Sequence, residues 1–218
     1  MVMNIVDINN RIAKKTPLLY EEILISSDTV LYIVEINNLK MIPDFDRYIS
    51  LANKIKSNYK NEKSLLQSLA GKCLLLHGLE KRMNKRISED DIMMEKLEHG
   101  KPYLVNHRDI EFNISHSGDF AICSISMHST GVDIENTDRK NTDILPLKKT
   151  FTCKEREKYN LEDFFRIWVM KESYLKMKGT GLSYDMTKLE TDEINDVNFY
   201  LFNFDKYIVS VSEPIICE

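Results

Sequence analysis

One short segment of the chain, Gly131-Val-Asp-Ile-Glu135, carries two carboxylates two residues apart. Side chains alternate faces along a β-strand, so Val132 and Ile134 would point into a core while Asp133 and Glu135 share the other face. Two carboxylates about 6–7 Å apart on one strand face repel each other unless a positive group lies over them. Their oxygens suit hard cations such as magnesium, manganese or calcium. The segment therefore suggests a cation site, although the pattern alone favours a merely hydrated acidic strand.

A third carboxylate, Glu172, occupies an unusual place on a predicted helix over residues 163–178. It falls within the apolar stripe of that helix, which comprises Phe165, Trp168, Val169 and Leu175. A carboxylate on a core-facing stripe is costly unless it is paired or binds a metal. Lys176, one turn further on, is the ordinary partner in the favourable Glu-to-Lys order. Both roles are compatible, because Glu172 can bind a cation while Lys176 reaches an anionic ligand.

His116 follows Ser115 at the end of a predicted strand, directly before a Gly-containing turn. A single histidine is more often structural than catalytic, but its position beside the acidic strand makes His116 a candidate ligand-binding residue.

Residues 51–86 are basic, with nine Lys and Arg against two Glu. Such a surface indicates an anionic small molecule or an acidic protein partner, and a solvated helix face is an equal alternative.

The composition places further bounds on function. At 218 residues, with 43% hydrophobic and 29% charged residues, the chain resembles an ordinary globular protein with one core or two closely packed halves. A net charge of −4 argues against a dedicated nucleic-acid binder. We find no signal-like segment and no apolar run near the ~20 residues of a membrane span. The four cysteines lack metal-like or thioredoxin-like spacing, so we expect reduced thiols and a cytoplasmic protein: Cys73, Cys123, Cys153 and Cys217.

The periodicity of the sequence predicts the elements that must position these residues. A β-branched run over residues 29–36 predicts a buried strand, and a helical pattern covers residues 45–84, with Gly78 as an expected end. Residues 110–116, 120–127 and 131–135 predict an antiparallel meander.

The C-terminal part of the chain gives further local signals. Thr152-x-x-Glu155 has the form of a capping box, which would open a helix near Cys153. Gly179 should end the helix over residues 163–178. A final hairpin is expected from residues 197–204 and 207–212.

Taken together, several segments of the chain resemble the 4′-phosphopantetheinyl transferases of the surfactin type. The resemblance rests on segments that occur in the family's order and at similar spacing: Gly100-Lys101-Pro102, Phe112-Asn-Ile-Ser-His-Ser-Gly118, Gly131-Val-Asp-Ile-Glu135, Phe151-Thr-x-x-Glu155, Trp168-Val-Met-Lys-Glu-Ser-Tyr-Leu-Lys176 and Gly179-Thr-Gly-Leu182. It spans roughly Ser64 to Leu182 and is specific as a set.

The resemblance implies an α+β fold of two similar halves in a pseudo-twofold arrangement, with the active site between them. We expect an N-terminal half over residues 1–108, and a C-terminal half over residues 109–218 that carries the metal-binding motifs. The implied activity transfers the 4′-phosphopantetheine arm of coenzyme A to a serine of an apo acyl or peptidyl carrier protein. The transfer would need magnesium and would release adenosine 3′,5′-bisphosphate. We expect a monomer that binds neither nucleic acid nor membrane.

The resemblance also implies roles for single residues. Asp133, Glu135 and Glu172 would bind magnesium, which agrees with the strand and helix patterns. The implied coenzyme A contacts are Lys54, Ser68, Gly100, Lys101, Pro102, Ser115, His116 and Lys176. Lys176 would also be catalytic. Glu155 would be the general base for the carrier serine, with a purely capping role as an even alternative.

Two positions depart from the family pattern. Gln67, before Ser68, stands where the family has Arg, so a positive charge is missing that Lys54, Lys56 or Lys72 could supply. Val169 replaces a usual Ser, Thr or Cys. Two alternatives stay open, and the two departures bear on the second of them. One is another metal-dependent phosphoryl-transfer enzyme, such as a nucleotide hydrolase that needs no carrier. The other is a catalytically silent module that binds a carrier protein.

Overall fold

Two four-stranded sheets form the centre of the computed structural model, which describes residues 4–9, 19–52, 61–138, 149–160, 163–181 and 184–216. The first sheet has the order β2-β3-β7-β6, with β2 (Tyr20–Leu24), β3 (Val30–Glu35), β6 (Glu111–Ser117) and β7 (Phe120–Ser126). The second has the order β1-β9-β10-β8, with β1 (Asn4–Asp7), β8 (Gly131–Asn136), β9 (Val197–Phe204) and β10 (Tyr207–Pro214). A small hairpin pairs β4 (Met94–Lys96) with β5 (Pro102–Leu104).

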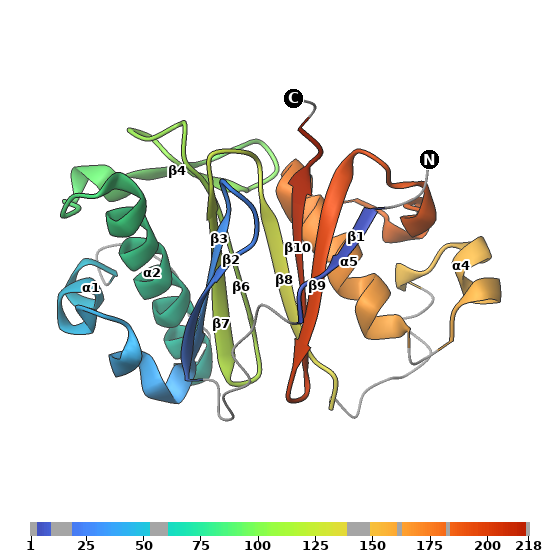
Figure 1. Cartoon of the computed structure of the whole chain (residues 1–218), viewed down its shortest axis with the longest axis horizontal. Coiled ribbons are helices and arrows are strands. Elements are labelled where there is room, and N and C mark those ends of the chain that lie inside the picture. Colours follow the sequence, from blue (N-terminus) through green and yellow to red (C-terminus); the bar gives the residue numbers. More distant parts are fainter. Residues whose placement is uncertain are drawn as a thin grey trace.

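The two sheets and their helices form four layers, seen in sequence across Figure 1. Helices α1 (Phe45–Ala52) and α2 (Glu62–Met83) pack on the outer face of the first sheet, and α5 (Phe164–Lys178) packs on the outer face of the second. Between the sheets lies a third apolar cluster, to which Leu31 and Ile122 contribute from one side and Val132 and Val209 from the other. The predicted α+β architecture is thus confirmed, and each half consists of one sheet with one long helix.

The predicted meander is wrong in its third strand. β6 and β7 form the expected antiparallel hairpin, but β8 pairs with β10 in the second sheet rather than with β7. Val132 and Ile134 are buried between the sheets, so the strand gains more apolar contact by facing the first sheet than it would by extending it. The alternation itself is as predicted, because Asp133 and Glu135 point to the opposite face of β8 and line a cavity beside α5.

Gly78 does not end the first long helix, contrary to the prediction from sequence. Helix α2 continues to Met83, and Asn84 closes it in the left-handed conformation with φ 49°. A Cβ on Gly78 would lie 2.3 Å from Ile125 Cδ1 and 2.7 Å from Tyr32 Cε2. The glycine is therefore needed for close approach of α2 to the first sheet, at the usual cost of glycine inside a helix.

The C-terminal elements agree with their predictions. The capping box of Thr152 and Glu155 opens α4 (Cys153–Lys158), Gly179 caps α5, and β9 and β10 form the final hairpin. The 3₁₀ turns are η2 (Ile36–Met41), η3 (Asp90–Ile92), η5 (Met186–Lys188) and η6 (Thr191–Glu193).

The division of the chain after residue 108 stays a prediction. Sheet membership changes later, between Ser126 and Gly131, because β6 and β7 belong to the first sheet.

Cys73, Cys123 and Cys153 are free thiols, as expected, and Cys217 lies outside the described residues. None of the described helices has the length and apolar character that a membrane crossing requires.

The contact between β8 and α5 gives a test of the fold. A Cβ on Gly131 would lie 2.0 Å from the carbonyl oxygen of Ser173 and 2.4 Å from the amide nitrogen of Met177. Because both are backbone atoms, the helix must move, and we expect Gly131→Ala to lower the free energy of unfolding by about 3 kcal/mol. Urea denaturation measures this. Gly100→Ala, with φ 89° and no atom within 4 Å of the new Cβ, should cost only about 1–2 kcal/mol of backbone strain. A Gly131→Ala midpoint equal to the wild-type midpoint would contradict the described packing.

Candidate active site

A cavity of about 580 Å³ opens between the two halves of the molecule. One wall comes from α2 and β6, and the other comes from β8 and α5. Its polar lining contains most of the residues predicted from sequence, namely Ser68, Ser115, His116, Asp133, Glu135, Glu172 and Lys176, together with Lys72. Pro102 and Gly181 also line it, with an apolar part that includes Phe112, Trp168 and Leu175. We call this cavity the cleft.

The carboxylate wall of the cleft is strongly desolvated. Asp133 is 4% exposed and Glu172 is 6% exposed. The buried oxygens Asp133 Oδ2 and Glu172 Oε1 have no hydrogen-bond partner among the described residues. Burial raises the pKa of Glu172 to about 7, Lys176 opposes this shift, and the negative charges of Asp133 and Glu135 add to it. This wall therefore carries more negative charge than its own hydrogen bonds satisfy.

Lys176 compensates part of that charge, but through a different partner from the one its spacing suggests. Its Nζ donates to Asp133 Oδ1 at 2.6 Å, to Ser115 Oγ at 3.1 Å and to the Val132 carbonyl at 3.3 Å. The pairing thus joins α5 to β8 instead of linking two turns of one helix. Ser115 Oγ also donates to Asp133 Oδ1, at 2.8 Å.

The donor set of this wall fits a hard cation in type. It offers three carboxylates, and two of them carry buried oxygens without partners. Among the residues that the structure describes, no three His, Cys, Asp or Glu side chains stand as a ready metal cluster. In the described structure, Asp133 Oδ1 accepts from Lys176 and Glu135 Oε2 accepts from Ser117. The assignment of Asp133, Glu135 and Glu172 to a cation therefore stays a prediction.

The opposite wall of the cleft carries the groups suited to an anion. Ser68 and Lys72 lie one turn apart on α2, so both side chains are on the same face of the helix. The His116 side chain is exposed at the rim of the cleft. Desolvation by neighbouring protein atoms nevertheless lowers its pKa, and the positive charge of Lys176 lowers that pKa further. His116 is therefore suited to donate to an anion as a neutral imidazole. Gln67, the residue that departs from the family pattern, donates from Nε2 to the Gly118 carbonyl at 3.2 Å.

Lys101 lies next to the cleft and does not line it in the described part of the chain. Its Nζ donates to Glu111 Oε2 at 2.7 Å, to the Met177 carbonyl at 3.1 Å and to Ser129 Oγ at 3.4 Å. These bonds tie the Gly100–Pro102 turn to the C-terminal end of α5. A role of Gly100 and Lys101 in holding coenzyme A remains a prediction, as does that of Lys54, which lies outside the described residues.

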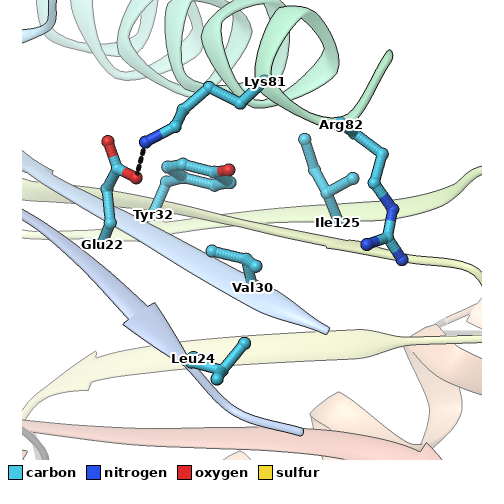
Figure 2. Close-up of a pocket in the computed structure, with 7 residues that line it drawn as sticks. All are labelled: Glu22, Leu24, Val30, Tyr32, Lys81, Arg82 and Ile125. Atoms are coloured by element: carbon cyan, nitrogen blue, oxygen red, sulfur yellow. Dashed lines mark hydrogen bonds and ion pairs between the residues drawn. The ribbon is translucent and has the colours of Figure 1, made fainter. Parts of the chain in front are cut away.

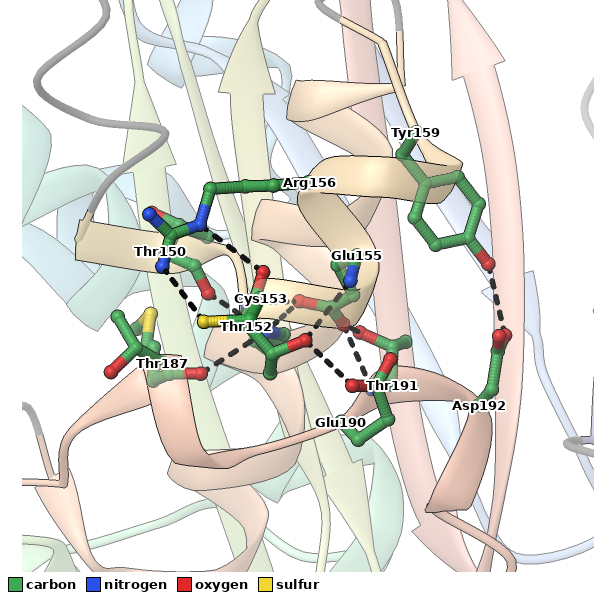
Figure 3. A network of polar contacts seen from close by, with 12 residues as sticks. Thr150, Thr152, Cys153, Glu155, Arg156, Tyr159, Thr187, Glu190, Thr191 and Asp192 are labelled. Carbon is green, nitrogen blue, oxygen red and sulfur yellow. Dashed lines mark hydrogen bonds and ion pairs between the residues drawn. The ribbon is translucent and has the colours of Figure 1, made fainter.

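Glu155 belongs to α4 and lies outside the cleft, with its side chain fully buried (Figure 3). Its oxygens accept from the amides of Thr152 and Thr191, each at 2.9 Å, and from the Thr191 hydroxyl. Oε2 also accepts from Lys171 Nζ at 2.5 Å, and both side chains of this pair are 0% exposed. We therefore interpret Glu155 as a helix cap and ion-pair partner, and the geometry gives no support to its predicted role as general base.

A second cavity, of about 410 Å³, lies on the first sheet and contains none of the predicted site residues. Lys81 pairs with Glu22 across its opening, and Tyr32, Val30 and Ile125 form its floor (Figure 2). Its lining contains a single carboxylate, that of Glu22, and the hydroxyl of Tyr32. The cleft is accordingly the better candidate for an active site.

Comparison with known protein families agrees with this assignment. Residues 49–128 match the family model described as 4′-phosphopantetheinyl transferase, N-terminal, and residues 129–213 match the 4′-phosphopantetheinyl transferase superfamily. The chain is 31% identical over 167 residues to the 4′-phosphopantetheinyl transferase gsp of Aneurinibacillus migulanus, which covers 73% of this chain and 68% of that protein. The chain belongs to the 4′-phosphopantetheinyl transferase superfamily. The two models meet between β7 and β8, where the polypeptide changes sheets.

Two further members of the superfamily match a smaller part of the chain. The 4′-phosphopantetheinyl transferase Sfp of Bacillus subtilis is 35% identical over 105 residues, 45% of this chain. The mouse L-aminoadipate-semialdehyde dehydrogenase-phosphopantetheinyl transferase is 32% identical over 144 residues, 57% of this chain. In each case the match spans 46% of the relative, about half of its length.

Two features of this site were not specified by sequence reasoning. Lys72 was one of three alternative lysines; it lies on the buried face of α2 at 8% exposure, and Lys54 and Lys56 lie outside the described residues. Lys171 was missed as the partner of Glu155. A lysine on the buried side of an amphipathic helix, two residues after the core residue Val169, was the available signal.

The Glu155–Lys171 pair supports a prediction about stability. We expect Lys171→Met to lower the free energy of unfolding by about 3–5 kcal/mol, because it leaves a buried carboxylate without its counter-charge. Lys171→Met combined with Glu155→Gln should recover part of this loss, because no isolated charge remains. Chemical denaturation of both variants measures the difference. A double variant that is less stable than Lys171→Met would contradict the charge-pair interpretation.

Proposed function

We propose that this protein transfers the 4′-phosphopantetheine arm of coenzyme A to a serine of an apo carrier protein. The observation that carries the proposal is the pairing of two unlike walls in one cleft: three carboxylates and Lys176 on one side, with Ser68, Lys72 and His116 on the other. A pyrophosphate with a nucleotide on one side and an extended arm on the other matches such a site. The membership of the chain in the transferase superfamily supports the same reading.

The reaction is a displacement at the β-phosphorus of coenzyme A. The serine oxygen forms a new bond to phosphorus, the bond between that phosphorus and the bridging oxygen breaks, and adenosine 3′,5′-bisphosphate leaves. Such transfers depend mostly on positioning and on neutralising charge on the phosphate oxygens. Lys176 lines the cleft, and its ammonium would exchange one of its three bonds, to Asp133, Ser115 or the Val132 carbonyl, for a bond to a phosphate oxygen. His116 supplies a second donor at the rim.

Asp133, Glu135 and Glu172 are the residues that would hold magnesium. When bound, the ion would neutralise the pyrophosphate charge that would otherwise be repelled by the three carboxylates. A cation would also lower the pKa of Glu172 and so favour its charged form.

Glu172 is our candidate for the group that accepts the proton of the carrier serine. It lines the cleft, and its buried Oε1 has no hydrogen-bond partner among the described residues, whereas Glu155 is 0% exposed and lies outside the cleft.

The central experiment incubates the protein with coenzyme A, magnesium and a panel of apo acyl and peptidyl carrier proteins, and reads modification by intact mass. We expect a carrier to gain the mass of the arm, with one adenosine 3′,5′-bisphosphate released for each modified carrier. Release of this nucleotide without a carrier would indicate a hydrolase instead. Carrier binding without modification or release would indicate a silent binding module.

Removing a charge from the carboxylate wall should slow the transfer. We expect Asp133→Asn and Glu172→Gln each to lower kcat/KM about a hundredfold or more, since each loses several kcal/mol of transition-state stabilisation. Asp196→Asn is the matched control, because Asp196 pairs with Lys178 of the same helix at an exposed position. Near wild-type turnover in both cleft variants would show that the carboxylates are misassigned.

The wall that carries Ser68 and Lys72 leads to a prediction about ligand selectivity. If Ser68 and Lys72 hold the 3′-phosphate, Lys72→Met should weaken binding of coenzyme A about tenfold and leave dephospho-coenzyme A unaffected, a difference that corresponds to one charge-assisted hydrogen bond. Calorimetry at low salt measures both ligands, because added salt screens such contacts. Lys63→Met, an exposed lysine of the same helix, is the control. An equal loss for the two ligands would remove Lys72 from the phosphate subsite.

A further inference from the structure

The two sheets meet at one margin through side chains rather than through a backbone ladder. β6 is the last strand of the first sheet and β8 the last strand of the second, and the two lie side by side in Figure 1. The backbone pairs of β6 go to β7, and those of β8 go to β10. Alternate residues of β6 point toward β8, and they supply the hydrogen bonds between the two strands.

These bonds form three rungs, which are two residues apart along β6. Asn113 Oδ1 accepts from the Val132 amide at 3.0 Å. Two residues on, Ser115 Oγ donates to Asp133 Oδ1 at 2.8 Å. Two residues further, Ser117 Oγ donates to Glu135 Oε2 at 2.8 Å. Two of the three rungs thus end on carboxylates of the cleft, so the register between the sheets and the position of these carboxylates are set by the same side chains.

Ser117 differs from Ser115 in its access to ligand. Ser115 lines the cleft, whereas Ser117 is 1% exposed and is not part of the lining. Its hydroxyl is used in both directions, because it accepts from the Asn136 amide at 3.1 Å while it donates to Glu135. The bond from the Asn136 amide holds the Ser117 oxygen against β8, so the Ser117 hydroxyl proton is directed at the Glu135 carboxylate. Glu135 is therefore oriented by a group that no substrate touches.

We propose that Ser117 is a positioning residue for the cation site, acting through Glu135. This inference rests on the proposed function, and specifically on Glu135 as a cation ligand. A neighbour that hydrogen-bonds a ligating carboxylate selects its rotamer before the ion arrives, and the loss of such a neighbour typically weakens metal binding by about 10–100-fold. The effect of Ser117 should accordingly fall on cation affinity and not on the binding of coenzyme A alone.

The test uses Mn²⁺ as the probe, titrated into the full chain and followed by the electron paramagnetic resonance signal of the free ion. We expect Ser117→Ala to weaken Mn²⁺ binding about tenfold. Ser117→Thr keeps the hydroxyl and should bind Mn²⁺ more tightly than Ser117→Ala. A purely packing role predicts the reverse order, because Thr adds a methyl group at a buried position and Ala removes only an oxygen. Ser124→Ala, a buried β7 hydroxyl that bonds Thr130 and no carboxylate, is the control and should bind Mn²⁺ like the wild type.

Two further measurements separate the possible failures. Calorimetry with coenzyme A in the presence of a chelator should give the same affinity for wild type and Ser117→Ala, and thermal melting shows whether each variant is folded. If wild type binds Mn²⁺ and Ser117→Ala binds it equally well, or binds it more tightly than Ser117→Thr, the positioning role is wrong while the proposed function stands. If wild type binds no Mn²⁺ with or without coenzyme A, the cation site is wrong, and this inference is overturned with it.

Discussion

The carboxylate wall of the cleft is the constraint on which much of this structure depends. Asp133, Glu135 and Glu172 come from two elements and line one cleft, where Asp133 and Glu172 are buried, so the repulsion between their charges is weakly screened. Burial contributes most to the raised pKa of Glu172, and the negative charges of Asp133 and Glu135 add to it. Lys176 offsets part of the repulsion by pairing with Asp133, and the hydroxyls of Ser115 and Ser117 each donate to one of the strand carboxylates. A site held at such a cost is well prepared for a cation, because a cation would relieve the repulsion.

The fold supports this wall from behind by a second charged pair. Glu155 and Lys171 are fully buried, and Lys171 Nζ also donates to the carbonyls of Thr150 and Met186, at 2.8 and 3.1 Å. All three ammonium donors are thereby satisfied, which is the condition under which a buried ion pair can be tolerated. Lys171 directly precedes Glu172 on α5, so the network that joins α4, η5 and η6 to that helix also fixes the turn that presents Glu172 to the cleft.

Local patterns predicted the parts of the site that a single element determines. The alternation in β8 gave the correct face for Asp133 and Glu135, and the apolar stripe of α5 placed Glu172 correctly. The capping box and the Gly179 cap were equally local. What failed depended on contacts distant in sequence. The sheet to which β8 belongs is decided by burial of Val132 and Ile134 against the other sheet. The sequence around Gly78 predicts a helix end, and only the close contacts with Tyr32 and Ile125 of the first sheet explain why a glycine occurs inside α2.

The assignment of Glu155 shows why motif spacing alone could not separate a base from a cap. A capping box requires a carboxylate or amide at the third helical position, and Glu155 meets that requirement whatever lies around it. A base must in addition be accessible to the proton that it accepts, and accessibility is set by α5, η5 and η6, which lie outside the capping box and follow it in the chain. Here those elements close over Glu155, and Lys171 takes the remaining lone pair of Oε2. Glu172 has the opposite combination: a core-facing position in its helix, yet an open path to the cleft. The cavity between the sheets, and not the helix signal in the sequence, therefore decides which of these two carboxylates has access to a ligand.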